Sequence, residues 1–329
     1  MTKDIFVYVE VQDNKIMDVS LELINKAKEL IDSRKDFGFQ VVGVLIGNKI
    51  SNLAAEVIYY GADKVIVCDH ADLSLYNTMN YAEIIKGIIK KYNPEIFLYG
   101  GTILGRDLAP RVSAKVNTGL TADATSIEFD PNDEFSKELW ITRPAFGGNL
   151  FATIVCPNHK PQMATVRGNV FEKAIRCENK RGEILEYKYD IITNNAITLV
   201  RKIDKIQKKS DITKAKIIVS GGRGMSSNID LLEETAINLK GEVGASRALI
   251  DEGLCPKTIQ VGQTGKTVKP IIYLACGISG AVQHTAGMEN SEMIIAINTD
   301  ENAPIFDVAD ISIVGDASKI LHELNTRFK

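Results

Sequence analysis

The sequence lacks the residue patterns on which several classes of protein depend. Its five cysteines, Cys68, Cys156, Cys177, Cys255 and Cys276, include no C-x-x-C pair, so zinc ribbons, iron–sulfur clusters and thioredoxin chemistry lack their ligands. No run of about 18 apolar residues occurs, as a membrane-spanning helix would need. Lys and Arg (39) nearly balance Asp and Glu (42), so no positive excess points to nucleic acid. We expect buried free thiols, no metal, no membrane insertion and no nucleic-acid partner.

What the chain does contain suits two globular domains. At 329 residues it is too long for one ordinary core, and 45% hydrophobic with 25% charged residues is typical of folded proteins. The N-terminal residues lead directly into an apolar run, Ile5–Val9, whereas a secretory signal needs a basic start and a longer apolar core. We therefore expect a cytoplasmic protein.

The first half alternates apolar runs with amphipathic stretches, which indicates βαβ units and a parallel sheet. The predicted strands are Val41–Gly47, Val65–Val67 and Ile96–Tyr99, and the predicted helices are Leu21–Ile31, Asn52–Tyr60 and Tyr81–Lys91. After Gly119 the pattern changes to β-like segments separated by turn residues, which we interpret as extra strands ending the domain. These segments are Ala122–Phe129, Leu139–Arg143, Asn149–Val155 and Gln162–Val166.

A connector is predicted at Arg201–Lys216, which contains seven Lys or Arg and few large apolar residues. We place the boundary between an N-terminal α/β domain, residues 1–204, and a doubly wound α/β domain, residues 205–329. Parallel strands are predicted in the second domain at Lys216–Ser220, Ile271–Cys276, Met293–Ile297 and Ile311–Val314. Gly, Ser or Asp occurs within three residues after each of them, and open parallel sheets bind ligands at that edge.

A first glycine-rich motif, Gly222-Arg223-Gly224, follows the first of these strands. It fits the first two glycines of a dinucleotide fingerprint, but Ser227 stands at the third, and residues 226–230 delay the helix. Free backbone N–H groups beside Arg223 suit a phosphate, although a purely structural turn explains the glycines equally well. A nicotinamide nucleotide would require an acidic residue about 20 positions later, where Glu242 stands.

Two further motifs lie downstream. Gly265-Lys266-Thr267 ends like a P-loop, but the P-loop spacing requires glycine where Gln260 stands, which argues against an ATPase or GTPase. Gly277–His284 follows an apolar strand, and Ser279 is a good N-cap for a helix that we expect to begin there. Gly280 and Ala281 would let a ligand approach the first turn. His284 then stands one turn in, as a ligand contact or as an ordinary structural histidine.

Taken together, these strings resemble the flavin-binding series of the electron-transfer flavoprotein alpha subunit. In the second domain they are Gly222–Gly224, Ser246-Arg247, Val261–Lys266, Ser279–His284 and Asn298. In the first domain they are Gly105–Arg111, Thr118–Asp123, Arg143–Asn149 and Pro161–Arg167. The resemblance implies a heterodimer with a beta subunit and one FAD in the C-terminal domain. That domain would swivel to meet acyl-CoA dehydrogenases or other flavin dehydrogenases, while the first domain and the beta subunit form a static base.

The resemblance also implies roles for individual residues. Arg247 would lie by the isoalloxazine ring and His284 would donate to its O2 region, where reduction adds negative charge. Thr264 with Gln263 would reach the N5/O4 edge, and Arg223, Ser246 and Ser279–Ala281 would hold the pyrophosphate and ribityl oxygens. The adenosine end would meet Asn298 and Asp316, although Asp316 is as readily an N-cap for a helix at Ala317–Thr326. The rest of the predicted FAD-binding set is Gly222, Gly224, Val261, Gly262, Gly265, Gly280, Val282 and Gln283.

The first domain of this family carries no flavin, so we interpret Arg106, Asp107, Arg111 and Arg143 as domain-closing salt bridges and subunit-interface contacts. Three functions stay open at this point. The chain is an electron shuttle, or a member of an electron-bifurcating complex whose beta subunit binds a second FAD and oxidises NADH with ferredoxin as a separate partner. The remote alternative is a nucleotide-dependent transferase or NAD-binding sensor.

Overall fold

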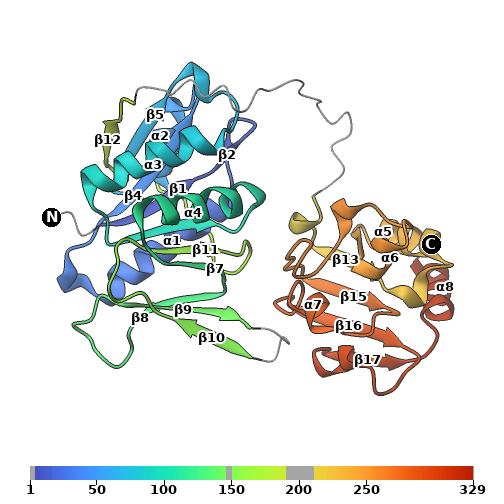
Figure 1. Cartoon of the computed structure of the whole chain (residues 1–329). Coiled ribbons are helices and arrows are strands. Elements are labelled where there is room, and N and C mark those ends of the chain that lie inside the picture. Colours follow the sequence, from blue (N-terminus) through green and yellow to red (C-terminus); the bar gives the residue numbers. More distant parts are fainter. Residues whose placement is uncertain (1–3, 146–149, 190–210, 329) are drawn as a thin grey trace. The chain divides into compact units, whose positions relative to one another are not determined.

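A computed structural model describes residues 4–145, 150–189 and 211–328, which divide into two compact units. The first unit comprises the described residues up to 189 and the second those from 211. The predicted boundary between residues 204 and 205 lies outside the described residues. Each unit contains its own parallel sheet and its own apolar clusters, so each is described by itself below (Figure 1).

The first unit is built on a seven-stranded sheet in the order β12-β5-β4-β1-β6-β11-β7, with parallel pairing throughout. Its central strands are apolar along their whole length and fully buried, because helices cover both faces. The strands are β1 (Ile5–Val9), β4 (Val41–Gly47), β5 (Lys64–Asp69), β6 (Ile96–Gly100), β7 (Leu120–Ala124), β11 (Gln162–Val166) and β12 (Glu183–Glu186).

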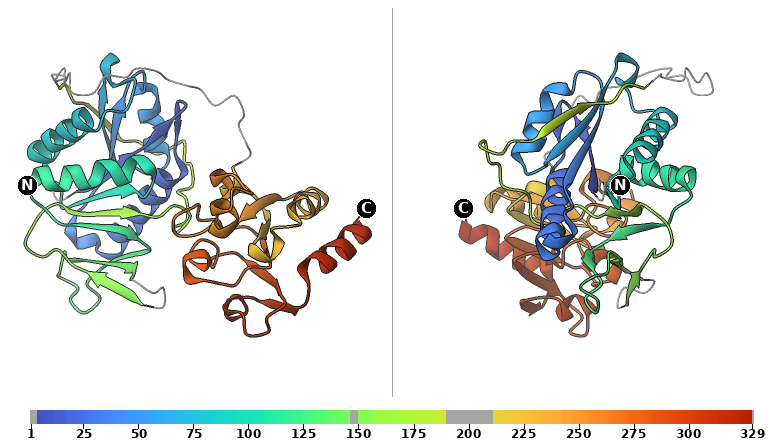
Figure 2. Two further views of the ribbon diagram at one scale, coloured as in Figure 1. Left: turned by 45° about the vertical axis from the view of Figure 1, so that its right-hand side comes forward. Right: turned by 90° about the vertical axis from the view of Figure 1, so that its left-hand side faces the viewer.

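Two pairs of helices cover this sheet. Helices α1 (Asp18–Ser33) and α2 (Ala54–Tyr59) bury their apolar residues in one cluster, and α3 (Thr78–Tyr92) and α4 (Ile103–Val116) bury theirs in another. The views in Figure 2 show the two pairs on opposite sides of the sheet. The expected parallel α/β core of the first domain is therefore confirmed.

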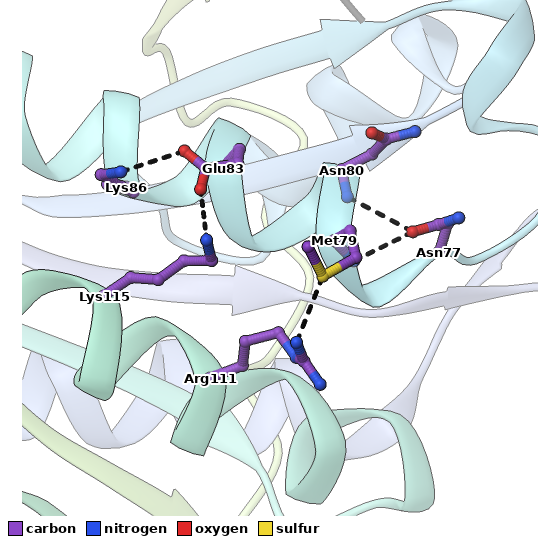
Figure 3. A network of polar contacts seen from close by, with 7 residues as sticks. All are labelled: Asn77, Met79, Asn80, Glu83, Lys86, Arg111 and Lys115. Carbon is purple, nitrogen blue, oxygen red and sulfur yellow. Dashed lines mark hydrogen bonds and ion pairs between the residues drawn. The ribbon is translucent and has the colours of Figure 1, made fainter. Parts of the chain in front are cut away.

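Polar contacts join α3 to α4 on the outer surface of the first unit (Figure 3). Glu83 of α3 pairs with Lys115 of α4 and, at 3.2 Å, with Lys86 on its own helix. Arg111 Nη1 lies 3.2 Å from the sulfur of Met79. Asn77 Oδ1 caps α3 by accepting hydrogen bonds from the backbone N–H groups that follow it, which explains where that helix begins.

Strands are present in the region where we expected them, but they belong to two different sheets, and the predicted segment Ala122–Phe129 is divided between two strands rather than forming one. Strands β7 and β11 extend the parallel sheet, whereas β8 (Ser126–Phe129), β9 (Leu139–Pro144) and β10 (Phe151–Ile154) form a separate antiparallel sheet. A small hairpin joins β2 (Val11–Gln12) to β3 (Lys15–Ile16). The expectation that the cysteines are buried holds for Cys68, Cys255 and Cys276, but Cys156 is half-buried and Cys177 is exposed.

The second unit is a five-stranded parallel sheet in the order β14-β13-β15-β16-β17. Its strands are β13 (Ile217–Gly221), β14 (Glu242–Ala245), β15 (Ile272–Cys276), β16 (Met293–Asn298) and β17 (Ile311–Val314). Its helices are α5 (Ile229–Asn238), α6 (Arg247–Asp251), α7 (Val282–Thr285) and α8 (Ala317–Phe328). The doubly wound parallel fold expected for this domain is confirmed, with β14 as a strand that the sequence pattern did not predict.

The strand order of the second unit fixes where a ligand would bind. From β13 the chain passes first to β14 on one side and then to β15 on the other, so the direction of winding reverses between β13 and β15. Open α/β sheets bind ligands in the crevice beyond the carboxyl ends of the strands at such a point. The glycine motifs at residues 222–224 and 277–280 follow these two strands.

Candidate functional site

A cavity of about 500 Å³ lies at this switch point in the second unit. Its walls come from the segments that follow β13, β14 and β15 and from the loop at residues 260–264. The lining residues are Gly222, Arg223, Ser246, Arg247, Ala248, Gln260, Val261, Gly262, Thr264, Gly277, Ile278, Ser279, Ala281, Gln283 and His284. Most of the flavin-site residues named from the sequence are thus brought together at one cavity.

The two glycine turns pack directly on each other at the base of the cavity. The N–H of Gly222 donates to the carbonyl of Cys276 at 2.8 Å, and that of Gly224 donates to Gly277 at 3.2 Å. A Cβ at Gly222 would lie 2.2 Å from the carbonyl oxygen of Gly277. The glycines are therefore required by the close approach of two backbones. As the sequence predicted, α5 does not begin until Ile229.

The loop at residues 260–266 is fastened to the short helix α7. The N–H of Gln263 donates to the carbonyl of Gln283 at 2.7 Å, and Gly262 has φ 135°. A Cβ at Gly262 would meet that same carbonyl at 2.6 Å, so a side chain would push the loop away. Gln260 Nε2 donates to Thr264 Oγ1 at 2.9 Å, which orients the threonine at the cavity.

Two guanidinium groups stand at the cavity with most of their surface in solvent. Arg223 is 80% exposed and lies 3.6 Å from Glu252, while Arg247 is 68% exposed and lies 3.1 Å from Asp251. Surface ion pairs of this kind contribute little to stability. Both groups are therefore free to turn toward an anionic ligand at small cost.

Two buried polar atoms that line the cavity have no hydrogen-bond partner among the described residues. They are Ser246 Oγ and His284 Nδ1. His284 is only 7% exposed, and burial lowers its pKa to about 4, so the ring is neutral at pH 7. Buried polar groups without partners are costly. A polar ligand in the cavity would satisfy both.

The segment after β15 differs from the sequence prediction. We expected a helix from Ser279, but α7 begins at Val282 and Ala281 is its N-cap. Gly280 has φ 90°, and the carbonyl of Ser279 accepts a hydrogen bond from the N–H of Ile305 at 3.0 Å. A Cβ on Gly280 would lie 2.0 Å from the backbone nitrogen of Ile305. Glycine is therefore needed at this position for the backbone contact with Ile305.

Asn298 and Asp316 do not line the cavity. Asn298 Nδ2 donates to the carbonyl of Ile278 at 2.8 Å, which braces the turn beside the cavity. Asp316 Oδ1 accepts from the N–H of Ser318 at 2.9 Å, so Asp316 caps α8. Their role at the adenosine end stays a prediction. The other predicted residues outside the lining are chain neighbours of residues in it: Gly224, Gln263, Gly265, Gly280 and Val282.

The cavity is also lined by residues that the sequence does not assign to the site: Ala248, Gln260, Gly277 and Ile278. In the sequence, Gln260 is notable only as the residue that breaks the P-loop spacing. Gly277 belongs to the motif after β15, but the family resemblance gives it no role in the site. Ala248 and Ile278 are small or apolar residues next to predicted ones, and nothing in the sequence marks them as ligand contacts.

The P-loop-like motif and the NAD-type acidic residue do not have the geometry that those sites require. Lys266 Nζ forms an ion pair with Asp211 at 2.7 Å, and among the described residues the next element after the loop is strand β15 and not the helix that a P-loop requires. Glu242 is the first residue of β14, whereas the cavity lies at the carboxyl ends, where Ala245 pairs with Gly221. A ribose-binding acid would have to stand at that carboxyl end. The NAD-binding alternative therefore loses its acidic residue.

The charged residues singled out in the first unit make several kinds of contact. Arg106 forms an ion pair with Asp123 at 3.1 Å, which ties α4 to β7 as expected. Asp107 instead accepts a hydrogen bond from Tyr76 at 2.6 Å. Arg143 is close enough to help lower the pKa of Asp123. Their part in a subunit interface stays a prediction.

Comparison with known proteins agrees with an N-terminal domain and a separate C-terminal domain that carries the cavity. The profile of the "Electron transfer flavoprotein domain" matches residues 5–191, and that of the "Electron transfer flavoprotein FAD-binding domain" matches residues 211–289. The electron transfer flavoprotein subunit alpha of Thermoanaerobacterium thermosaccharolyticum is 46% identical, over 99% of this chain and 98% of its own.

Two further relatives match along almost the whole chain. The acryloyl-CoA reductase electron transfer subunit beta of Anaerotignum propionicum is 43% identical over 97% of this chain and 94% of its own. The lactate dehydrogenase (NAD(+),ferredoxin) subunit LctC of Acetobacterium woodii is 40% identical over 98% of this chain and 76% of its own. The chain therefore belongs to the electron transfer flavoprotein family, as an alpha subunit whose C-terminal domain is the FAD-binding domain.

Proposed function

We propose that the cavity at the switch point holds the isoalloxazine and phosphate portions of FAD and that the protein carries electrons through it. The charged and polar side chains that line the cavity support this most directly. Two exposed guanidiniums, of Arg223 and Arg247, and two unpartnered buried polar atoms, of Ser246 and His284, meet at one cavity. Its volume of about 500 Å³ lies in the range of small-molecule sites.

The residues around the cavity have distinct tasks in this proposal. Arg223, Ser246 and the backbone at Ser279–Ala281 hold phosphate and ribityl oxygens, because cations and free N–H groups suit anions. Arg247 and His284 face the side of the ring that becomes negative on reduction, and Thr264 faces the opposite polar edge. When bound, FAD supplies one- and two-electron redox chemistry. The residues supply position, charge and exclusion of water.

We infer that the beta subunit docks on the first unit at its antiparallel sheet. In the part of the chain that the structure describes, β10 is an edge strand that pairs with β9 alone. Leu150, Phe151 and Val155 expose 67%, 62% and 43% of their surface on and beside it. An exposed apolar edge of this kind is a typical protein-interaction surface. In the heterodimer, this unit and the beta subunit form the static base.

The second unit moves on that base in our proposal, so that the flavin meets a dehydrogenase, such as an acyl-CoA dehydrogenase, and then an electron acceptor. Division of the chain into two compact units with separate apolar clusters supports such movement. Among the described residues, no helix combines the length and apolarity that crossing a bilayer requires. We place the complex in the cytoplasm, as the sequence led us to expect.

Electron bifurcation is a second candidate, favoured by one relative. The Acetobacterium woodii protein is a subunit of a lactate dehydrogenase whose name includes both NAD(+) and ferredoxin. In that case the beta subunit would hold a second FAD and oxidise NADH, and the flavin of this chain would relay one branch of the electrons. The residues of the cavity in this chain suit both functions.

One experiment tests the proposal and separates the two candidates. The chain is co-expressed with its beta subunit, the complex is purified without oxygen, and the FAD and AMP extracted per heterodimer are counted. One FAD with one AMP indicates a shuttle, and two FAD without AMP indicate bifurcation. A complex without FAD would contradict the proposal. Arg223→Ala with Ser246→Ala should lower the FAD content. Lys216→Ala should leave it unchanged, because the exposed Lys216 precedes the amino end of β13, at the edge of the sheet opposite the cavity.

A further inference from the structure

A buried tyrosine lies behind the histidine of the cavity. Tyr273 belongs to β15 and is fully buried, and its hydroxyl lies 2.9 Å from His284 Nε2. Their rings are tilted by 58° with centroids 6.1 Å apart, so the contact is made edge to edge through the polar atoms. The other ring nitrogen, Nδ1, is buried and has no partner among the described residues. His284 is therefore held at one nitrogen and open at the other.

Burial fixes the protonation state of the His284 imidazole and of the Tyr273 hydroxyl. Burial keeps His284 neutral at pH 7, so its ring carries one proton, and burial raises the pKa of Tyr273, so the phenol stays protonated. In the Tyr273–His284 contact, either Tyr273 donates to Nε2 and the imidazole proton sits on Nδ1, or the reverse holds. The hydrogen bond made by Nε2 thus decides whether Nδ1 is a hydrogen-bond donor or an acceptor.

We propose that Tyr273 is a positioning residue, whose O–H donates to Nε2 and thereby holds His284 as the Nδ1–H tautomer, with its donor available to the flavin. This inference rests on the proposed function, in which His284 faces the ring oxygen that becomes negative on reduction. The reverse tautomer would leave a bare lone pair on Nδ1, which repels such an oxygen. Two acceptors facing each other in a buried site are unfavourable.

The backbone next to the ring favours the same tautomer. Val261, which also lines the cavity, counteracts the lowering of the His284 pKa through its backbone. That is the sign expected of a carbonyl that attracts an imidazole proton, since a carbonyl can only accept. Because Tyr273 takes Nε2, a nearby carbonyl favours the ring proton on Nδ1, and among the described residues Nδ1 still makes no hydrogen bond. This is the arrangement that second-shell partners impose on functional histidines.

The tautomer can be measured directly, with or without flavin. Histidine labelled with ¹⁵N in the complex gives separate signals for protonated and unprotonated ring nitrogens, and the chain has only four histidines. The His284→Gln variant identifies the signals of His284. We expect Nδ1–H to predominate at pH 7 in both the FAD-loaded and the FAD-depleted complex. A predominant Nε2–H tautomer would overturn the proposal without any further variant.

Tyr273→Phe removes the donor and keeps the ring in the core. We expect the ratio of the two tautomers to fall about tenfold, the change that the loss of one hydrogen bond produces, and the flavin midpoint potential to decrease. The matched control is Tyr99→Phe, because Tyr99 is also fully buried and its hydroxyl has no partner among the described residues. That variant should change neither quantity.

The outcomes separate this inference from the proposed function. If Tyr273→Phe retains FAD but leaves both the tautomer ratio and the potential unchanged, Tyr273 is only a packing residue. If the unmodified complex binds no FAD, the proposed function fails, while the tautomer of His284 in the same sample still tests the contact with Tyr273. Loss of folding in Tyr273→Phe leaves the measurement on the unmodified complex as the deciding one.

Discussion

Arg247 and Arg223 look alike in the structure, since both are exposed cations at one cavity, but we predict different consequences of removing them. Arg247→Ala should lower the flavin midpoint potential by tens of millivolts with FAD still largely bound. Its cation favours the reduced, more negative ring, and a single charge–charge interaction at a partly exposed site is worth roughly 1 to 4 kcal/mol. A redox titration of the complex measures this.

The control for that prediction is Arg223→Ala, which removes the same charge from the same cavity. We expect it to weaken FAD binding, because its role is to hold a phosphate, and to change the potential of the retained flavin little. Arg247→Lys should restore most of the lost potential, since it restores the charge. An unchanged potential in Arg247→Ala would remove the role of this residue at the ring.

His284 should make the stability of the second unit depend on pH. Burial lowers its pKa to about 4, against about 6.5 in an unfolded chain. As the pH falls below 6.5 the unfolded state takes up a proton first. The stability tied to the neutral ring is thus complete above pH 6.5, declines toward pH 4 and is lost below it, by up to about 3 kcal/mol.

The temperature of FAD release, followed by flavin fluorescence in the heterodimer, measures this effect. Between pH 6.5 and 4.5 it should fall more steeply in the unmodified chain than in His284→Gln, which cannot take up a proton. Parallel curves for the two proteins would mean that His284 titrates normally in the folded state. The carboxylates and the other histidines of the complex titrate in both proteins and cancel in the comparison.

At the residue scale, the sequence could predict the site only where it carries a motif. Arg247, Thr264 and His284 stand in recognisable strings, and the structure places all three at the cavity. Tyr273 could not be found in this way, because an aromatic residue inside an apolar strand looks like any core residue. Its contact with His284 depends on how β15 and α7 pack, which no local pattern records.

At the scale of elements, strands were predicted better than the sheets they join. The segments around β7 and β11 have clear strand patterns, but their pairing with the central sheet depends on contacts far apart in the sequence. Strand β14 was missed because Glu-Val-Gly-Ala is short and half of it is small. The start of α7 was misplaced because the conformation of Gly280 is set by Ile305, not by its chain neighbours.

One carboxylate, that of Asp123 on β7, links α4 to the residue that follows β11. Asp123, in the left-handed region at φ 65°, accepts two hydrogen bonds from the buried Arg167, at 2.6 and 3.1 Å, and one from the exposed Arg106 at 3.1 Å. Burial alone would raise its pKa, but Arg167, Arg106 and Arg143 hold it below the usual value. The carboxylate therefore stabilises the first unit at neutral pH and loses this effect as the pH falls through its folded pKa.

Asp123→Asn should destabilise the first unit by about 3 kcal/mol at pH 7, because it removes the carboxylate charge from its ion pair with the buried Arg167. Asparagine tolerates the left-handed backbone, so the change tests charge alone. Arg106→Gln, which removes the exposed partner of the same carboxylate, should cost less than about 1 kcal/mol. Urea unfolding of the two variants measures the difference, and equal losses would contradict the distinction between them.

At the scale of the whole molecule, the proposal requires that the first unit bind the beta subunit without help from the flavin cavity. Phe151 on β10 exposes 62% of its surface, so Phe151→Asp should not disturb the core of this chain. If β10 forms the interface, burying that carboxylate against the beta subunit carries a desolvation cost of several kcal/mol. Size-exclusion chromatography of the co-expressed subunits should then show loss of the heterodimer.

A matched variant decides whether that loss is specific to β10. Ile175 lies in the same unit, away from the antiparallel sheet, and exposes 88% of its surface, so Ile175→Asp adds the same charge at a site that the proposal leaves in solvent. We expect that variant to form the heterodimer normally. If Phe151→Asp also does so, β10 is not the interface, and FAD bound at the usual ratio would show that the cavity functions independently of where the beta subunit docks.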